Sequence, residues 1–370
     1  MHENHDYLTK QIITCIGNKR SLLDFITQGV HIVQKRLNKN KLDIFDVFTG
    51  SCIAARLCKQ FSNSLIVNDL EKYSSVTAEC YLSNKNKIDI PLLKEIYNDL
   101  LATVNDKTLK EGVIAGLYSP KDDNNIKENE RVFYTHRNAM YIDTMRNAID
   151  AVPVQYQKYF LAPLIAEASV HANTSGVFKG FHKNRKTGIG QFGGSNSDAL
   201  FRIKGDIVLP FPVFSNFDCE YKVYNGDANL IVKEAPEVDL AYLDPPYNQH
   251  PYGSNYFMLN LILENKYPKN ISKVSGIPAD WKRSDYNKKH LAFSALSGLI
   301  ANIKAKYVLI SFNSEGFISL DEMKDMLQKT GKVEVLETSY NIFRGCRNLS
   351  RAKQSTRNIH VTEYLYLVEK

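Results

Sequence analysis

The sequence has few cysteines, and they form no recognisable pattern. Six cysteines are scattered over 370 residues, without a Cys-x-x-Cys pair or a Cys/His cluster. Neither a structural zinc site nor a disulfide framework is therefore indicated, and we expect no bound metal.

Long apolar runs are also missing. No stretch approaches the ~18 apolar residues of a membrane-spanning helix. The first five residues are polar and lack the core of a signal peptide. We therefore expect a protein of the reducing cytoplasm with no membrane partner. The net charge of +7 is compatible with nucleic-acid binding but is common in other proteins too.

The stretch that says most about chemistry is 238–247, which reads V-D-L-A-Y-L-D-P-P-Y. Its apolar residues predict a short buried strand, and its two prolines cannot donate to a sheet ladder. Asp244, Pro245, Pro246 and Tyr247 should therefore follow the carboxyl end of a strand. Open α/β sheets bind their ligands at that edge.

These residue types suit the exocyclic amine of a nucleobase, whose lone pair is delocalised into the ring. An ionised Asp244 only accepts hydrogen bonds, and the Pro245 carbonyl is a second acceptor, held in place because Pro246 follows it. Tyr247 offers a flat face on which an extruded base could stack. The alternative is a strand that ends in a Pro-Pro turn with a surface tyrosine.

A strand, glycine loop and helix are predicted near the start of the chain. A strand at 42–47 leads into Phe48 and Gly50, and a helix is expected at 53–61. The next strand, 65–67, ends near Asp69, 19 positions after Gly50, where an acid can bind ribose hydroxyls. Alternatively, Phe48 belongs to the core and Asp69 to an ordinary turn.

Three segments are basic. Residues 173–204 contain one acid, several phenylalanines and four closely spaced glycines, which suits a loop that orders on phosphates and bases. The other basic segments are 266–289 and a loop at 340–358. This loop joins two predicted strands, and the second of them, 359–368, should close the sheet. Each segment could instead be a plain basic surface. The candidate DNA contacts are Lys179, Lys183, Arg185, Lys186, Arg283, Arg344 and Arg347.

The D-P-P-Y motif after an apolar strand resembles the adenine-specific DNA methyltransferases that use S-adenosylmethionine, and the motif order resembles their Dam-like group. By this resemblance Lys19, in a loop with Gly17, holds the methionine carboxylate. Phe48 and Gly50 match half of an F-x-G-x-G loop, with Cys52 in place of the second glycine. Asp227 would face the adenine of the cofactor, and Asp244 would border the same site. Cys15 stands where the family usually has an aromatic residue.

The resemblance implies an α/β fold, a Rossmann-like S-adenosylmethionine-dependent methyltransferase sheet with an inserted target-recognition region. We expect residues 1–80 and 216–370 to form the catalytic and cofactor-binding domain and 81–215 to be the insertion. A buried helix at 158–170 could belong to the catalytic core. Helices are also expected at 91–104, at 138–152 and from residue 255, where aromatic residues could line the base pocket.

The expected reaction moves a methyl group from S-adenosylmethionine to the exocyclic amine of a flipped adenine in double-stranded DNA. In this family it usually protects DNA from a cognate restriction endonuclease. No cysteine nucleophile is required, and the sequence contains no Pro-Cys dipeptide. The same chemistry on a cytosine amine, on RNA or on a protein amide remains open. A non-catalytic DNA-binding subunit that keeps this fold is the alternative from another class.

Overall fold

The computed structural model describes residues 2–194, 199–313, 316–341 and 360–370. Arg344 and Arg347, two of the candidate DNA contacts, lie outside these residues. Within the described ranges, no helix combines the length and the apolar character needed to cross a bilayer.

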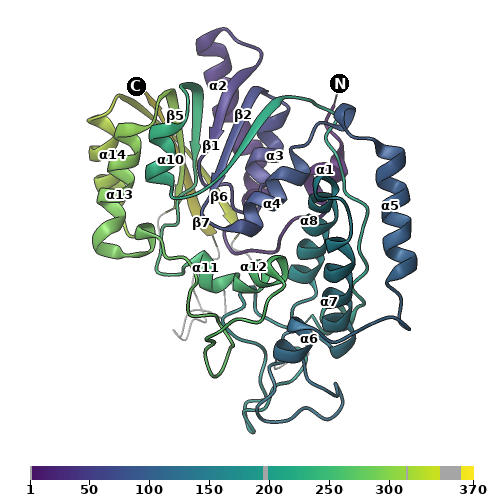
Figure 1. The fold of residues 1–370 in the computed structure, drawn as a ribbon. Coiled ribbons are helices and arrows are strands. Elements are labelled where there is room, and N and C mark those ends of the chain that lie inside the picture. Colours follow the sequence, from purple (N-terminus) through teal and green to yellow (C-terminus); the bar gives the residue numbers. More distant parts are fainter. Residues whose placement is uncertain (1, 195–198, 314–315, 342–359) are drawn as a thin grey trace.

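A mixed sheet forms the centre of the molecule (Figure 1). Within the described residues it has seven strands in the order β3-β2-β1-β4-β5-β7-β6. Neighbours from β3 to β5 are parallel, whereas β7 is antiparallel to both β5 and β6. The strands are β1 (Leu42–Asp46), β2 (Ser62–Asp69), β3 (Glu220–Asn225), β4 (Val238–Leu243), β5 (Ala305–Asn313), β6 (Lys332–Asn341) and β7 (His360–Glu369).

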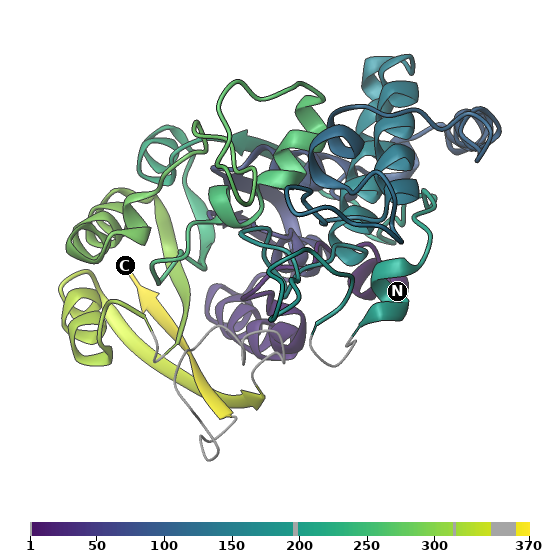
Figure 2. The same ribbon diagram turned by 90° about the horizontal axis from the view of Figure 1, so that it is seen from below.

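The chain reverses its direction of progress across the sheet between β1 and β4. From β1 the next strands, β2 and β3, lie on one side, whereas β4 and β5 lie on the other. Such a switch point leaves a crevice beyond the carboxyl ends of the two central strands, where ligands bind. In Figure 1 this edge faces down toward α11 and α12, and Figure 2 looks at it from below.

Helices cover both faces of the sheet because the side chains of each central strand alternate between the two faces. Leu240 and Tyr242 of β4 pack against the helices of one face, and Ala241 and Leu243 against those of the other. The first group of helices is α2 (Leu23–Leu37), α3 (Ile53–Lys59) and α4 (Lys72–Tyr81). The second group is α10 (Ala228–Glu234), α13 (Lys289–Asn302) and α14 (Leu320–Gln328).

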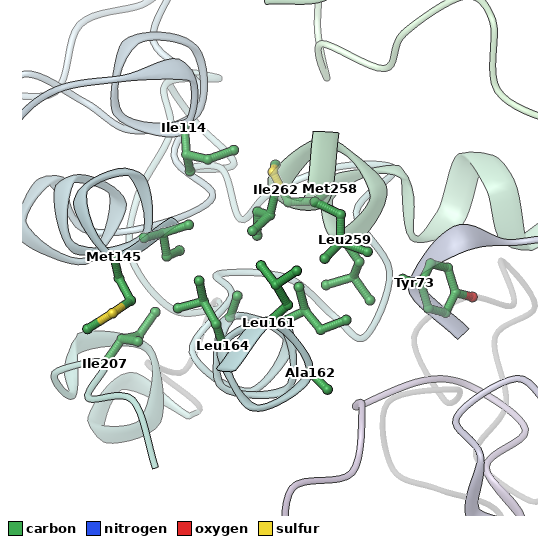
Figure 3. Close-up of a cluster of buried hydrophobic side chains, with 14 of the residues drawn as sticks. Tyr73, Ile114, Met145, Leu161, Ala162, Leu164, Ile207, Met258, Leu259 and Ile262 are labelled. Atoms are coloured by element: carbon green, nitrogen blue, oxygen red, sulfur yellow. The ribbon is translucent and has the colours of Figure 1, made fainter. Parts of the chain in front are cut away.

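A further helical layer lies beside α4 and shares a hydrophobic core with it (Figure 3). Leu161 and Leu164 of α8 contact the cluster that also holds Tyr73 of α4 and Leu259 of α12. The layer contains α5 (Ile90–Thr103), α6 (Val113–Tyr118), α7 (His136–Asp150), α8 (Val154–Val170), α11 (Tyr252–Asn255) and α12 (Phe257–Glu264). The remaining short elements are α1 (His5–Thr9), η1 (Lys19–Leu22), η2 (Lys85–Lys87), α9 (Leu200–Lys204) and η3 (Asp285–Asn287).

The expected α/β fold and its main elements are confirmed. The helices expected at 91–104, 138–152 and 158–170 are α5, α7 and α8, and the strand expected before the D-P-P-Y motif is β4, buried along its whole length. The division of the chain at residues 80 and 216 stays a prediction. The core that α8 shares with α4 and α12 supports placing the 158–170 helix with the catalytic body.

Two expectations about position were wrong. The last strand does not close the sheet, because β7 lies between β5 and β6 and leaves β6 at the edge. Tyr256 and Phe257 do not line a base pocket. They are 1% and 3% exposed, and both pack in the core between α4 and the helical layer.

Candidate active site at the carboxyl edge of the sheet

A pocket opens at the switch point, beyond the carboxyl ends of β1 and β4. It encloses about 920 Å³ of empty space, part of which is open to solvent. The pocket gathers segments that are far apart in the sequence, at 15–19, 48–54, 68–71, 226–228 and 282–287. All of the residues expected to contact a cofactor line it: Gly17, Lys19, Phe48, Gly50, Asp69, Asp227 and Asp244.

Asp244 directly follows β4, and its side chain is 20% exposed toward this pocket. One carboxylate oxygen, Oδ1, lies 3.1 Å from the Nζ atom of Lys19. Burial raises the pKa of Asp244 to about 6, although the Lys19 ammonium opposes this rise. The group is therefore ionised at neutral pH and able to accept hydrogen bonds from an amine placed in the pocket.

Lys19 does not stand free in the pocket. Its Nζ atom also donates to Glu363 Oε1 at 2.7 Å, and its side chain is only 5% exposed. Gly17, in the same loop, has a φ of +81°, and a Cβ there would lie 3.2 Å from the hydroxyl of Tyr252. The loop thus needs glycine both for its left-handed backbone and for the close approach of Tyr252.

The loop after β1 has the shape expected of a ligand cradle. Gly50 has a φ of +53°, and its backbone N–H donates to Asp69 Oδ2 at 2.7 Å. Cys52 replaces the second glycine of the family-like pattern, yet it keeps a left-handed φ of +67° at the start of α3. For a cysteine this conformation costs roughly 1 kcal/mol or more. The loop therefore preserves the glycine-type backbone although the second glycine is absent.

Asp69 ties the glycine loop to the end of β2. While Oδ2 accepts from Gly50, Oδ1 accepts from the backbone N–H of Glu71 at 2.9 Å. The Ser74 hydroxyl and the Leu70 backbone N–H also act on this carboxylate, which borders the pocket. Burial raises the pKa of this carboxyl group, and the hydrogen bonds from Glu71 and Gly50 oppose the rise.

Asp227 and Phe48 form two other parts of the wall. Asp227 is exposed and caps α10, because its Oδ1 accepts from the backbone N–H of Asn229 at 2.9 Å. Phe48 is half-buried, and its ring meets that of Tyr286 edge to face, with 5.1 Å between their centroids. These two aromatic rings give the pocket an apolar surface on which a flat base can lie.

The rest of the D-P-P-Y motif lies between two cavities. Pro246 lines the main pocket, whereas Pro245, Pro246 and Tyr247 line a second, smaller cavity beside it. The Tyr247 ring packs edge to face against Phe312 at a centroid distance of 5.9 Å. Stacking of an extruded base on Tyr247 therefore stays a prediction.

Three residues of this region were not expected from the sequence. Glu71 lines the pocket, and burial together with the nearby Asp69 charge raises its pKa to about 7. The N-D-L-E run at the end of β2 could have pointed to it. Tyr252 lines the pocket and touches the Gly17 loop, where its hydroxyl donates to the Ile16 carbonyl at 3.1 Å, and Glu363 reaches Lys19 from β7. No local sequence signal indicates these last two.

The basic segment after α8 forms a defined hairpin. An antiparallel bridge joins Lys183 to Gly190, and the buried Asn173 fixes the base of the hairpin. The side-chain amide of Asn173 donates to the carbonyls of Val132 and Gln191 at 2.7 and 2.8 Å. We call residues 183–190 the basic hairpin. Lys179, Lys183, Arg185 and Lys186 are all exposed.

The segment that leads into the basic hairpin packs against α11. The backbone N–H of Phe178 donates to the carbonyl of Asn255 at 2.7 Å. Partial burial, together with the nearby Lys179 ammonium, lowers the pKa of His250, three residues after Tyr247. On the other rim of the pocket, Arg283 is exposed and stacks over Trp281 at 4.2 Å. Lys179 thus lies near the segment that follows the D-P-P-Y motif, and Arg283 lies between the pocket residues Lys282 and Ser284.

The comparisons with known proteins agree with this geometry. The family model described as D12 class N6 adenine-specific DNA methyltransferase matches residues 16–326. The type II methyltransferase M.CviAII of Paramecium bursaria Chlorella virus 1 is 30% identical over 362 residues, which cover 95% of this chain and 97% of that protein. M.NlaIII of Neisseria lactamica is 28% identical over 364 residues, covering 96% and 98%. The modification methylase StsI of Streptococcus sanguinis is 27% identical over 96% of this chain and 51% of its own length.

The matched region begins in the Gly17 loop and continues through the glycine loop, the catalytic motif and most of α14. Its description names adenine, which decides against the cytosine alternative, and it names an enzyme rather than a binding subunit. The chain belongs to the D12 class of N6 adenine-specific DNA methyltransferases.

Proposed function

We propose that this chain is the modification enzyme of a type II restriction-modification system. It would transfer a methyl group from S-adenosylmethionine to the N6 amine of an adenine flipped out of double-stranded DNA. The observation that carries the proposal is the single pocket that joins Asp244 to the Gly50 loop, Asp69 and Asp227. The relatives named as type II methyltransferases support the restriction-modification context, in which a cognate endonuclease would cut unmodified DNA.

The residues of the pocket fit S-adenosylmethionine. Asp69 borders the pocket, where its carboxylate would accept from ribose hydroxyls, and Phe48 with Tyr286 offers an aromatic surface for the adenine ring. Asp227 borders the same pocket, where it would face the adenine. When bound, the cofactor supplies an electrophilic methyl group whose bond to sulfur breaks, leaving the electron pair on the sulfur as the new nitrogen–carbon bond forms.

Asp244 and the Pro245 carbonyl would orient the target amine. Both are acceptors, so they draw the two N6 hydrogens to one side and direct the nitrogen lone pair toward the methyl group. Catalysis then rests mainly on proximity and orientation, which can supply several kcal/mol of the barrier. After transfer, the nitrogen releases a proton to Asp244 or to water. Tyr247 would stack on the flipped base.

The DNA would lie across the carboxyl edge of the sheet. The basic hairpin, Lys179 and Arg283 would contact phosphates, as would Arg344 and Arg347. We assign catalysis and cofactor binding to residues 1–80 and 216–370 and target recognition to 81–215. The position of the basic hairpin within 81–215 supports this division.

Labelled-methyl transfer tests the proposed function. The purified chain is incubated with methyl-labelled S-adenosylmethionine and duplex DNA of random sequence, which is then digested to nucleosides. Label should appear as N6-methyladenine alone. Label on cytosine, or no label at all, would refute the proposal. Sequencing modified bases in an expressing host would identify the recognised site.

The rate of methyl transfer should fall as the pH drops through about 6. Burial raises the pKa of Asp244 to this value, so the carboxyl group is ionised above pH 6 and protonated below it. Once protonated, it loses acceptor capacity toward the amine. Single-turnover rates measured between pH ~5 and ~9 would show this acid limb. A flat profile over that range would mean that ionisation of Asp244 does not control the reaction.

Removing charge from the tip of the basic hairpin should weaken DNA binding for all sequences alike. Arg185 and Lys186 are exposed, and neither has an ion-pair partner within the described part of the chain. Replacing both with alanine should reduce the slope of log affinity against log salt by about two. Fluorescence anisotropy at several salt concentrations measures this slope.

The control for this prediction is the double alanine variant of Lys85 and Lys87. Both lysines are exposed and lie on η2, near the amino end of β3. They are therefore at the opposite edge of the sheet from the pocket, which lies at the carboxyl ends of the strands. This variant loses the same charge but should keep the salt slope. Equal slopes for both variants would mean that the basic hairpin does not contact phosphates.

A further inference from the structure

Three ionisable side chains from distant parts of the chain meet behind the pocket. Lys19 comes from η1, Asp244 from the end of β4 and Glu363 from β7. The Lys19 Nζ atom lies 2.7 Å from Glu363 Oε1 and 3.1 Å from Asp244 Oδ1. One ammonium group therefore bridges two carboxylates, of which only that of Asp244 is partly open to the pocket.

The sheet itself places Glu363 at this point. In the pairing of β5 with β7, Glu363 lies opposite Asn313, at the carboxyl end of β5. Ser311 of β5 donates its hydroxyl to Glu363 Oε1 at 2.6 Å. Within the described residues, the other oxygen of Glu363 is buried without a hydrogen-bond partner, and the residue is 0% exposed.

Such a carboxylate is costly to bury, and it is not needed to neutralise Lys19. Asp244 alone would balance the ammonium, so Glu363 leaves the group of three with one excess negative charge. Replacing a buried ionic group with an apolar one is often neutral or stabilising. Stability therefore does not account for a fully buried glutamate next to the proposed catalytic acid.

We propose that Glu363 is a positioning residue for methyl transfer, which holds the Lys19 ammonium and shares it with Asp244 so that Asp244 stays a strong hydrogen-bond acceptor. This inference rests on the role of Asp244 in the proposed function. In this inference the role of the Lys19 ammonium is to pair with the carboxylate of Asp244. Glu363 itself does not touch substrate; it acts through Lys19.

The charges around Asp244 set the direction of the effect. Burial raises its pKa, Lys19 lowers it, and the Glu363 carboxylate raises it again by repulsion. Asp46 at the end of β1 also faces the group, as do the phenols of Tyr242, Tyr247 and Tyr252 and the thiol of Cys15. Without Glu363, Lys19 would interact with Asp244 alone. Asp244 would then become more acidic and a weaker acceptor.

The test is the pH profile of the Glu363→Gln variant in single-turnover methylation of duplex DNA. Glutamine has nearly the same shape and can still accept from Lys19 and Ser311. The acid limb should move to lower pH by about one unit, and the rate on the plateau should fall roughly threefold because the acceptor is less basic. Affinities for DNA and for S-adenosylhomocysteine should stay at the wild-type values.

A matched control is Asp239→Asn. Asp239 is also a buried carboxylate of this sheet, but it pairs with Lys39 and Lys306 at the start of β4, opposite the pocket. This variant can lose stability but should keep the wild-type acid limb. A shift of the same size in the control would show that any buried charge in the sheet moves the profile, and would overturn the proposal.

Glu363→Asp extends the test and replaces Glu363→Gln if the latter does not fold. It keeps the charge but withdraws it from Lys19, so its acid limb should lie between those of the wild type and the glutamine variant. An unmoved limb in every folded variant would overturn the proposal. If wild-type protein transfers no methyl group, or if transfer does not depend on Asp244, the proposed function fails instead, which distinguishes the two failures.

Discussion

Replacement of Asp244 with alanine is expected to abolish methyl transfer and leave DNA binding nearly unchanged. In the proposed function the carboxylate is the main acceptor for the target amine, and without it the nitrogen lone pair would no longer be directed at the methyl group. The loss should be at least ~1,000-fold in the single-turnover rate, because orientation and proton acceptance are both removed. Labelled-methyl transfer and duplex binding, measured on the same preparation, check the two halves of the prediction.

The fold should tolerate this change. Removing Asp244 leaves Lys19 paired with Glu363 at 2.7 Å, so no buried cation loses its last partner. The side chain is partly exposed to the pocket, and alanine there opens space that water can fill. An equal loss of DNA binding and of transfer would mean that Asp244 belongs to the binding surface. Asp244→Asn, which keeps one acceptor oxygen, should retain slightly more activity than the alanine variant.

Local signals were sufficient to predict the centre of this site. Asp244 and Gly50 each follow a strand and Asp69 is the last residue of one, and parallel strands bring their carboxyl ends to one edge of the sheet. Gly50 and Asp69 come early in the chain and Asp244 comes later, as expected for two halves of a sheet that meet at a switch point. The pocket that joins them follows from those strand ends, although the sequence does not give its shape.

Contacts between distant segments could not be predicted in this way. Glu363 reaches Lys19 across 344 positions, through a strand that inserts antiparallel between β5 and β6. The hydrophobic pattern of β7 fits an edge strand as well as an inner one, so its place in the sheet depends on its neighbours. Tyr256 and Phe257 were misplaced for a similar reason: aromatic residues beside a catalytic motif can face the core as well as a ligand.

Changing Asp69 to asparagine is expected to weaken cofactor binding by about 10- to 100-fold, since hydrogen bonds to a charged group contribute roughly 1.5–3 kcal/mol each. The carboxylate supports the Gly50 backbone and would also accept from the ribose, so one substitution affects both contacts. The methylation rate at saturating cofactor should change much less, because the proposed function gives Asp69 no contact with the target amine. Calorimetry with S-adenosylhomocysteine measures the first quantity, and single-turnover methylation measures the second.

Glu71→Gln is the control that shows which acid binds the ribose. Glu71 lines the same pocket, but its Oε2 accepts from the side-chain amide of Asn260 at 2.7 Å. Burial raises its pKa to about 7, so it is only about half ionised at neutral pH and should contribute less as a charged acceptor. We expect this variant to bind the cofactor within about threefold of the wild type. If Glu71→Gln weakens binding as much as Asp69→Asn does, Glu71 is the ribose ligand and Asp69 only supports the glycine loop.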